Sequence, residues 1–446
     1  MFSLGEMADI VGAKPPAVDA RPSRVVHDSR RIAEGDLFVA LRGARTNGHA
    51  FLTEAFRRGA CGAILAEPTL APRSARGLIV VEDPLAALQH LASAWRERLT
   101  ATIVGITGSN GKTTTRSLLA HLLSTRWSVH QPRENYNTEI GLPLALLAMP
   151  STSEVGVFEL GTQAPGEIAL LASILRPTVG IVTGVGPSHL AGLRSLGAVA
   201  EEKWSLIDAL PADGFAFIHA DSPHLTESIG RAPCEVCTVG LTTGSVRGHV
   251  LAAVPRLVVQ LAEPALRLET GLVGRHNAGN VLLAAACALR LGLRSDAVEQ
   301  AVRSFESPAH RLRPLKAPFG TLLDDTYNAN PSSMEAALRV LSEYGGPTMR
   351  RVFVFGDMLD LGEASERLHR EILERAFTFG IDQIIPVGEQ AAAACGSRSN
   401  SQRLPSDHCT QATELRGRLS GRDNVVLVKG SRALGLEKLV DEPLKG

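Results

Sequence analysis

The sequence predicts an α/β protein of three domains: a small α/β domain at residues 1–84, a central parallel-sheet domain at 85–312 and a Rossmann-like domain at 313–446. Three observations support this prediction. A length of 446 residues corresponds to about three domains of ordinary size. Apolar runs typical of strands alternate with stretches of helical period, which predicts parallel sheets covered by helices. Three prolines within residues 308–318 interrupt this alternation, and it then begins again.

The first domain is predicted to hold a short sheet and one helix. Its expected elements are strands at 36–41, 63–66 and 78–81 and a helix at 51–58. Two polar turns, residues 27–30 and 42–49, separate these elements, and their spacing alone favours solvated loops. Leucines and one tryptophan then recur at helical spacing over residues 85–99, which predicts an amphipathic helix leading into the central domain.

The central domain is organised around a glycine-rich turn, GITGSNGKTT at residues 105–114. The apolar run before it predicts a strand at 101–106, and the stretch after it predicts a helix at 114–123. Such a turn directs backbone N–H groups and the positive end of the helix at one point, which suits a phosphate chain. Lys112 is expected to reach the outer phosphates and the Thr113 hydroxyl to bind Mg²⁺. The turn is a variant loop, since Ile106 stands where the usual pattern has its first glycine.

Alternating elements continue on both sides of the proline-rich linker. In the central domain we expect further strands at 155–160, 178–183 and 215–219, helices at 166–175, 197–209 and 278–291, and a small antiparallel β insert at 247–270. In the third domain we expect strands at 320–323, 351–355, 383–387 and 425–428 and helices at 332–343, 364–378 and 433–440. The third domain lacks a glycine-rich dinucleotide-binding motif, and we predict a doubly wound fold for it.

Polar residues that follow the central strands are candidates for chemistry. Glu159 ends the strand at 155–160, where a carboxylate can hold a hard cation against phosphates. His189 follows the strand at 178–183, and its position leaves a structural role and a ligand role equally open. Lys203 lies on a helix beside two glutamates that could pair with it. If it faces the metals instead, it should carry a charge-reversing modification, because an ammonium group repels cations. The loop at 134–139 is either an exposed turn or a grip for phosphate and substrate.

The composition narrows the class of protein. Lys and Arg total 46, as do Asp and Glu, so the balanced charge favours neither a nucleic acid partner nor an anionic membrane. No apolar run reaches the roughly 18–20 residues that span a bilayer, and residues 1–10 do not resemble a signal peptide. The six scattered cysteines make no disulfide framework for a chain of this length. We expect an enzyme of the cytoplasm with no membrane insertion.

Eight motifs in a fixed order carry a resemblance to a known family. They are GITGSNGKTTTR, ENYNTEIGLPLALL, VFELGTQAPGEI, TGVGPSHL, EEKW, GRHNAGN, HRL and DDTYNANPSSMEAAL. Together they resemble the Mur ligases of peptidoglycan synthesis over nearly the whole chain. The motifs NYNTEIGLP, DTYNANP and FGDMLDLG are similar to the branch that adds D-alanyl-D-alanine to UDP-N-acetylmuramoyl-tripeptide. The motif DNPR, which would favour the ligase for the third amino acid, does not occur.

The resemblance implies ATP and two Mg²⁺ ions at the glycine-rich turn. It places the first ion on Thr113 and Glu159 and the second on His189 and a carbamylated Lys203, whose anionic carbamate resolves the charge conflict. The nucleotide is expected on Gly108, Ser109, Asn110, Gly111, Lys112, Thr113 and Thr114, with Asn277 at the adenine, Arg311 at the γ-phosphate and Asp325 at the ribose. The residues expected to act in catalysis are Lys112, Lys203, His189 and Arg311.

The resemblance also implies where the other substrates bind. The UDP-sugar is expected at Ser29, Arg30, Thr46, Gly48 and His49, substrate and phosphate at Asn135, Asn137 and Thr138, and the dipeptide at Lys429 and Ser431. The expected reaction passes through an acyl phosphate on a monomeric protein. Alternatives are another Mur ligase, a folylpolyglutamate-type synthetase, or a nucleotide-dependent switch or motor.

Overall fold

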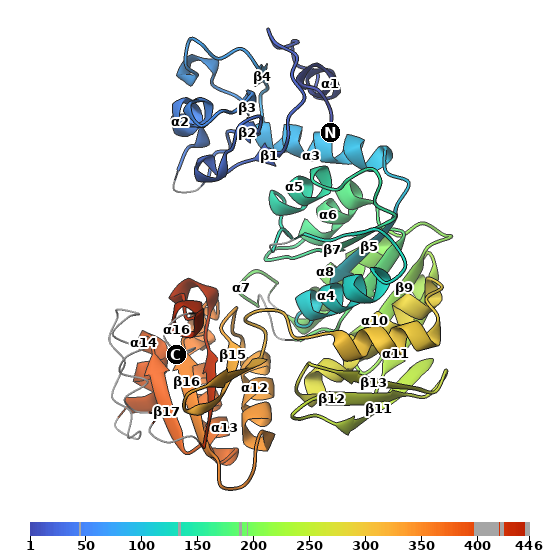
Figure 1. The fold of residues 1–446 in the computed structure, drawn as a ribbon, viewed down its shortest axis with the longest axis vertical. Coiled ribbons are helices and arrows are strands. Elements are labelled where there is room, and N and C mark those ends of the chain that lie inside the picture. Colours follow the sequence, from blue (N-terminus) through green and yellow to red (C-terminus); the bar gives the residue numbers. More distant parts are fainter. Residues whose placement is uncertain are drawn as a thin grey trace.

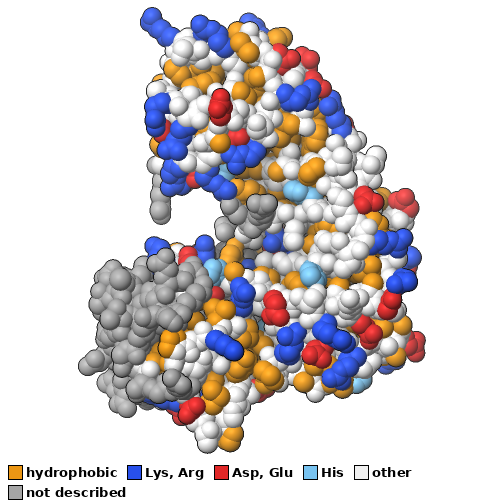
Figure 2. Space-filling model, viewed as in Figure 1, with side chains coloured by type: hydrophobic (Ala, Val, Ile, Leu, Met, Phe, Trp, Pro, Cys, Tyr) orange, Lys and Arg blue, Asp and Glu red, His pale blue; other side chains and the backbone are white. Residues whose placement is uncertain are grey.

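The computed structural model describes residues 1–43, 46–132, 135–186, 190–193, 195–396, 419 and 423–441. The chain forms three bodies in sequence order, with the first and third attached to the middle one (Figure 1). The space-filling view shows the molecule hollowed on one side, between the first body and the C-terminal body (Figure 2). None of the described helices is long and apolar enough to cross a membrane.

The first domain holds a parallel sheet whose strands lie in chain order. The strands are β1 (Val25–Val26), β2 (Leu37–Val39), β3 (Gly62–Leu65) and β4 (Leu78–Val80), and the helices are α1 (Leu4–Ile10) and α2 (Leu52–Arg57). The predictions for β2, β3, β4 and α2 are confirmed. The short elements α1 and β1 were missed, although a capping box formed by Ser3 and Glu6 marks the start of α1.

Helix α3 (Pro84–Glu97) joins the first domain to the central one. Asp83 caps the helix by accepting from the N–H groups of Leu85 and Ala86. The fully buried Leu88 and Leu91 belong to a hydrophobic core that runs from the first sheet through α3 into helix α5 (Gly141–Leu147). Because the two domains share this core, the first domain is anchored to the central domain by packed apolar side chains.

The central domain is built on a nine-stranded sheet in the order β13-β12-β11-β10-β9-β8-β5-β7-β6. Its strands are β5 (Thr102–Thr107), β6 (Val129–His130), β7 (Val155–Glu159), β8 (Val179–Val182), β9 (Phe215–His219), β10 (Glu235–Gly240), β11 (Val246–Ala252), β12 (Leu257–Leu261) and β13 (Leu266–Thr270). Besides α5, its helices are α4 (Lys112–Leu123), α6 (Glu167–Leu175), α7 (Leu190–Leu193), α8 (Leu196–Asp208), α9 (Pro223–Thr226), α10 (Ala278–Arg290) and α11 (Ser295–Ser304). Helices α4 and α10 pack on one face and α6 and α8 on the other.

The predicted β insert is present but is not a separate unit. Strands β11, β12 and β13 pair antiparallel as expected. Strand β11 also pairs parallel with β10, Val239 with Val246 and Gly240 with Arg247. The insert therefore extends the central sheet.

The C-terminal domain contains a five-stranded sheet in the order β14-β15-β18-β16-β17. The strands are β14 (Arg313–Ala317), β15 (Gly320–Asp325), β16 (Arg350–Gly356), β17 (Gln383–Val387) and β18 (Asn424–Lys429), and the helices are α12 (Pro331–Glu343), α13 (Ser365–Thr378), α14 (Glu389–Cys395) and α16 (Glu437–Asp441). Apolar clusters cover both faces of the sheet, which confirms the doubly wound prediction.

Two predictions in this domain need correction. The second half of the expected linker is β14, an edge strand paired antiparallel with β15. Pro314 is tolerated there because an edge strand has no neighbour on its outer side. The helix expected at 433–440 is divided into a 3₁₀ turn at Arg432–Leu434 and α16, because Gly435 between them adopts a left-handed φ of 62°.

Candidate active site

A cavity of about 980 Å³ lies between the central and C-terminal domains. The predicted site residues that line it are Ser109, Asn110, Gly111, Lys112, Thr113, Thr114, Asn135, Asn137, Thr138, Glu159, Asn277, Arg311, Asp325 and Lys429. Parallel strands present their carboxyl ends at one edge of the sheet, so the loops after β5 and β7 meet there. The fold thus brings the glycine-rich turn, the strand-end carboxylate and the C-terminal domain to one place.

The turn between β5 and α4 needs glycine at two positions. Gly108 has a φ of 145°, and a Cβ atom there would lie 2.0 Å from Thr183 Oγ1. Gly111 has a φ of 85°, and a Cβ atom there would lie 2.2 Å from Asn280 Oδ1. Ile106 is fully buried in β5. The glycine that the usual motif has at that position is therefore not required by this backbone.

Lys112 opens α4 and points back over the turn. Its Nζ donates to the Gly108 carbonyl at 2.6 Å. Burial lowers the pKa of Lys112 to about 8; the Glu159 carboxylate opposes this and Arg311 adds to it. The ammonium group is therefore mostly charged at neutral pH and lies among the groups of a phosphate-binding loop.

A buried cluster surrounds Glu159, which is only 2% exposed. The Thr113 hydroxyl donates to Glu159 Oε2 at 3.3 Å, and Arg311 Nη2 donates to the same hydroxyl at 3.0 Å. Arg116, one turn along α4, forms an ion pair with Glu159 through its Nε at 3.3 Å from Oε1. Arg116 was missed, although its spacing from Lys112 places both on one side of the helix.

The cluster fits a hard cation. A hydroxyl and a carboxylate stand side by side, and both are oxygen donors that Mg²⁺ prefers. Among the described residues, Glu159 Oε1 is buried and has no hydrogen-bond partner, despite the nearby Arg116. A buried carboxylate is costly unless positive charge compensates it, and a Mg²⁺ ion would add to the charge that Arg116 already supplies.

Lys203 is 1% exposed on α8. Its pKa is lowered to about 7, because burial and the positive Lys112 outweigh the adjacent Glu202. The Glu202 carboxylate is engaged elsewhere, since it accepts from the backbone N–H groups of Gly166 and Ile168 at 2.7 Å each. His189, the partner expected for Lys203, lies outside the described residues.

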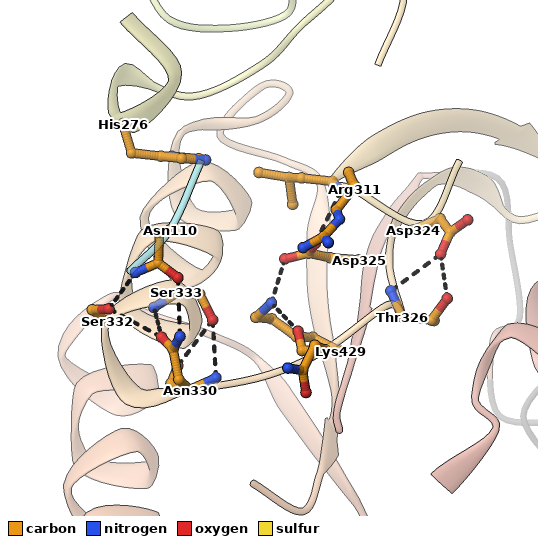
Figure 3. A network of polar contacts seen from close by, with 12 residues as sticks. Asn110, His276, Arg311, Asp324, Asp325, Thr326, Asn330, Ser332, Ser333 and Lys429 are labelled. Atoms are coloured by element: carbon orange, nitrogen blue, oxygen red, sulfur yellow. Dashed lines mark hydrogen bonds and ion pairs between the residues drawn. The ribbon is translucent and has the colours of Figure 1, made fainter. Parts of the chain in front are cut away.

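Hydrogen bonds also hold the side chains at the part of the cavity where the nucleoside is expected. Asn277 donates to the Val273 carbonyl at 2.9 Å and accepts from Asn280 at 2.9 Å. Asp325 accepts from Lys429 Nζ at 2.7 Å (Figure 3). Lys429, which we expected at the dipeptide, is therefore already paired with the residue expected at the ribose.

Ser431 is buried and is not among the residues that line the cavity. Its hydroxyl accepts from the Leu359 N–H at 2.8 Å, and its own N–H donates to the Asp357 carbonyl at 2.9 Å. The structure thus places Ser431 beneath the loop that carries Leu359, and its contact with the dipeptide stays a prediction.

Two domains meet directly at the glycine-rich turn. The side chain of Asn110 accepts from Asn330 Nδ2 at 2.9 Å and donates to Ser332 Oγ at 2.9 Å. Asn330 is also the N-cap of α12, where its Oδ1 accepts from the Ser333 N–H at 2.9 Å. Figure 3 shows these side chains converging from the two domains. The turn is therefore held at one end by the first turn of a C-terminal helix.

The first-domain candidates lie away from this cavity, and none of them lines it. Ser29 is buried, and the exposed Arg30 forms an ion pair with Asp28 at 2.8 Å. Thr46 is exposed and Gly48 starts a 3₁₀ turn. His49 is buried, with one ring nitrogen accepting from the Ala66 N–H at 2.8 Å and the other 2.7 Å from Asn47 Oδ1.

Sequence reasoning missed a contact between the first and central domains. Arg31 Nη1 donates to the Tyr136 hydroxyl at 3.1 Å. Tyr136 lies between Asn135 and Asn137, whose side chains are hydrogen-bonded to each other at 3.2 Å. This contact connects the turn after β1 to the loop that lines the cavity.

Comparison with known proteins finds related sequences along nearly the whole chain. Three family models match it: Mur ligase family, catalytic domain, at residues 23–96; Mur ligase middle domain at 106–288; and Mur ligase, glutamate ligase domain, at 310–432. A UDP-N-acetylmuramoyl-tripeptide–D-alanyl-D-alanine ligase of Bacillus subtilis is 31% identical over an alignment that covers 99% of this chain and 97% of that protein.

Two solved MurF structures are also similar to this chain over nearly its whole length. MurF from Acinetobacter baumannii superposes with a TM-score of 0.87 at 26% identity, covering 99% of this chain and 98% of that one. MurF ligase from Thermotoga maritima, in complex with ADP, gives 0.82 at 28% identity, covering 94% and 96%. The chain therefore belongs to the Mur ligase family.

Proposed function

We propose that this chain is the ATP-dependent, ADP-forming ligase that joins D-alanyl-D-alanine to UDP-N-acetylmuramoyl-tripeptide in peptidoglycan synthesis. One observation carries the proposal: Lys112, Thr113, Glu159 and Arg311 converge on a single cavity of about 980 Å³ between two domains. A cavity of this size accommodates a nucleotide together with peptide substrates. The similarity to MurF ligases over nearly the whole chain supports the choice of substrates.

The reaction must make a carboxylate reactive before an amine attacks it. An oxygen of the tripeptide's terminal carboxylate attacks the γ-phosphorus, and the bond to ADP breaks with its electron pair leaving on ADP. The neutral amine of the dipeptide then attacks the acyl phosphate carbon. The carbon–oxygen bond to phosphate breaks with its electron pair leaving on phosphate, and the nitrogen gives up a proton to the released phosphate or to water. In such transfers the protein contributes mainly positioning and charge stabilisation.

Lys112 and Arg311 supply the charge that this scheme requires. The carboxylate and the γ-phosphate are both anions, so their approach is opposed by Coulomb repulsion. Lys112 extends over the phosphate-binding turn, and Arg311 reaches it through the Thr113 hydroxyl at 3.0 Å. The substrates come from different domains, so closing the cavity excludes water that would hydrolyse the acyl phosphate.

Two Mg²⁺ sites belong to the proposal. Thr113 and Glu159 would hold the first ion, and His189 with a carbamylated Lys203 the second. When bound, the ions shield the negative charge of the phosphates. Carbamylation requires a neutral amine to attack carbon dioxide, and the burial of Lys203, with a pKa lowered to about 7, favours that form. The product is a carbamate anion, which suits a position beside cations.

We also propose that the protein is a monomer of the cytoplasm. Most of the residues assigned here to the nucleotide, and both residues assigned to the first metal, line one cavity. UDP-linked substrate and ATP would both have to reach the hollow between the domains, which opens to solvent (Figure 2).

A panel of amine acceptors tests the substrate assignment. ADP release is followed with UDP-N-acetylmuramoyl-tripeptide and either D-alanyl-D-alanine or single amino acids. We expect the dipeptide to be used in strong preference. Preference for a free amino acid would instead assign the chain to a sibling ligase.

Replacing Ser332 with alanine tests the contact between the domains. The change removes the acceptor of the Asn110 side chain. Losing one such hydrogen bond should raise KM for ATP by about threefold to tenfold. Ser342→Ala is the matched control, because that hydroxyl bonds within the same helix, to the Arg339 carbonyl, and does not line the cavity. Equal KM values in the two variants would contradict a role for this contact.

A further inference from the structure

Arg311 rests on an aromatic ring. Its guanidinium carbon lies 3.8 Å from the centroid of the Tyr327 ring. The same group donates to the Thr113 hydroxyl through Nη2 at 3.0 Å. Its Nε is buried and has no hydrogen-bond partner among the described residues. The ring therefore contacts this guanidinium group in addition to the hydrogen bond to Thr113.

The ring is itself held in place. Tyr327 follows β15, and its N–H donates to the His310 carbonyl at 3.1 Å. His310 in turn lies 3.0 Å from Asp324 Oδ2 through Nδ1. The guanidinium carbon of Arg432 lies 5.4 Å from the same ring centroid, and Arg432 is paired with Glu437 at 3.1 Å. The Tyr327 ring is therefore positioned by its backbone hydrogen bond and by the arginine side chains that contact it.

An aromatic support has a property that a carboxylate lacks. A ring face attracts a guanidinium through its quadrupole and orients it, and the contact strengthens where water is excluded. It leaves the full positive charge of Arg311 available. A carboxylate in the same place would orient the group but would compete with a phosphate for its charge.

We infer that Tyr327 is a positioning residue of the reaction: its ring holds the Arg311 guanidinium flat and directed at Thr113 and the phosphate beyond. The inference rests on the proposed function. It assigns to Tyr327 a role that depends on the ring and not on the hydroxyl.

Three variants test the inference. In Tyr327→Leu we expect kcat/KM for ATP to fall by about tenfold to thirtyfold, the effect of losing a desolvated cation–π contact. Tyr327→Phe keeps the ring and should stay within about threefold of the wild type. Phe379→Leu is the matched control, because it removes another arginine–ring contact of this domain, with Arg339 at 5.2 Å, away from the cavity. Thermal unfolding of each variant separates loss of fold from loss of alignment.

A second measurement asks whether the ring acts through the arginine. In an Arg311→Lys background the flat guanidinium is absent, so adding Tyr327→Leu should cost less than about twofold further. An undiminished loss in that background, or Tyr327→Leu within about twofold of the wild type in an otherwise native enzyme, would overturn the inference. Failure of the proposed function is distinguishable, because the wild type itself would then show no dipeptide-dependent ADP release.

Discussion

Replacing Lys112 with alanine should lower kcat for ADP release by about a thousandfold, with both peptide substrates present. Lys112 lies over the phosphate-binding turn, with its Nζ 2.6 Å from the Gly108 carbonyl. Removing it leaves the carboxylate and the γ-phosphate to approach each other with one cation fewer. Lys316→Ala is the matched control, since Lys316 is exposed on β14 and does not line the cavity. A loss of less than about tenfold would show that Lys112 does not act in the transition state.

The protonation state of Lys112 also predicts how kcat/KM for ATP depends on pH. Burial lowers the pKa of Lys112 to about 8, and the role requires the protonated form. The charged fraction is high below pH 8 and falls above it, so kcat/KM for ATP should decline as pH rises through about 8. The profile of the Lys112→Ala variant should lack this step.

Replacing Lys203 with alanine should abolish detectable ligation. Lys203 is almost fully buried, and its amine is the group proposed to carry the carbamate. Added bicarbonate should not restore activity, because the variant has no amine to modify. Short carboxylic acids should restore part of it by placing an anion in the space that the side chain leaves.

The control for this prediction is Lys438→Ala, an exposed lysine outside the cavity. A second readout is direct detection of the carbamate in the wild type with carbon-13-labelled bicarbonate. Full activity in Lys203→Ala would remove the carbamate from the mechanism.

The sequence predicted the centre of the cavity well because strand order decides it. A glycine-rich turn after one parallel strand and a glutamate after its neighbour must meet at one sheet edge. The structure places Thr113 Oγ1 3.3 Å from Glu159 Oε2. The boundaries of β5, β7 and α4 also agree with the hydrophobic pattern.

Contacts between domains could not be predicted in the same way. Arg31 reaches Tyr136, and Asn110 reaches Ser332, across more than a hundred residues in each case. No periodicity encodes such pairs, because they depend on how whole domains are placed. The contact of Tyr327 with Arg311 could likewise not be predicted. The spacing of Tyr327 in the sequence does not distinguish a ring that supports an arginine from a ring packed in the core.

Two side chains predicted to contact substrate already have partners within the fold, which the sequence did not reveal. His49 was expected to face substrate, yet both of its ring nitrogens lie against groups of its own domain. Lys429 was expected to meet the dipeptide, yet it pairs with Asp325. In both cases a buried polar group is satisfied within the fold, as burial requires.

The most direct measurement is ADP release with UDP-N-acetylmuramoyl-tripeptide, with and without D-alanyl-D-alanine. We predict sustained release only when both are present, in equal amounts with the amide product. Steady hydrolysis of ATP with neither peptide substrate would contradict the account, because a phosphate-binding loop that needs no carboxylate acceptor is a switch or a motor and not a ligase.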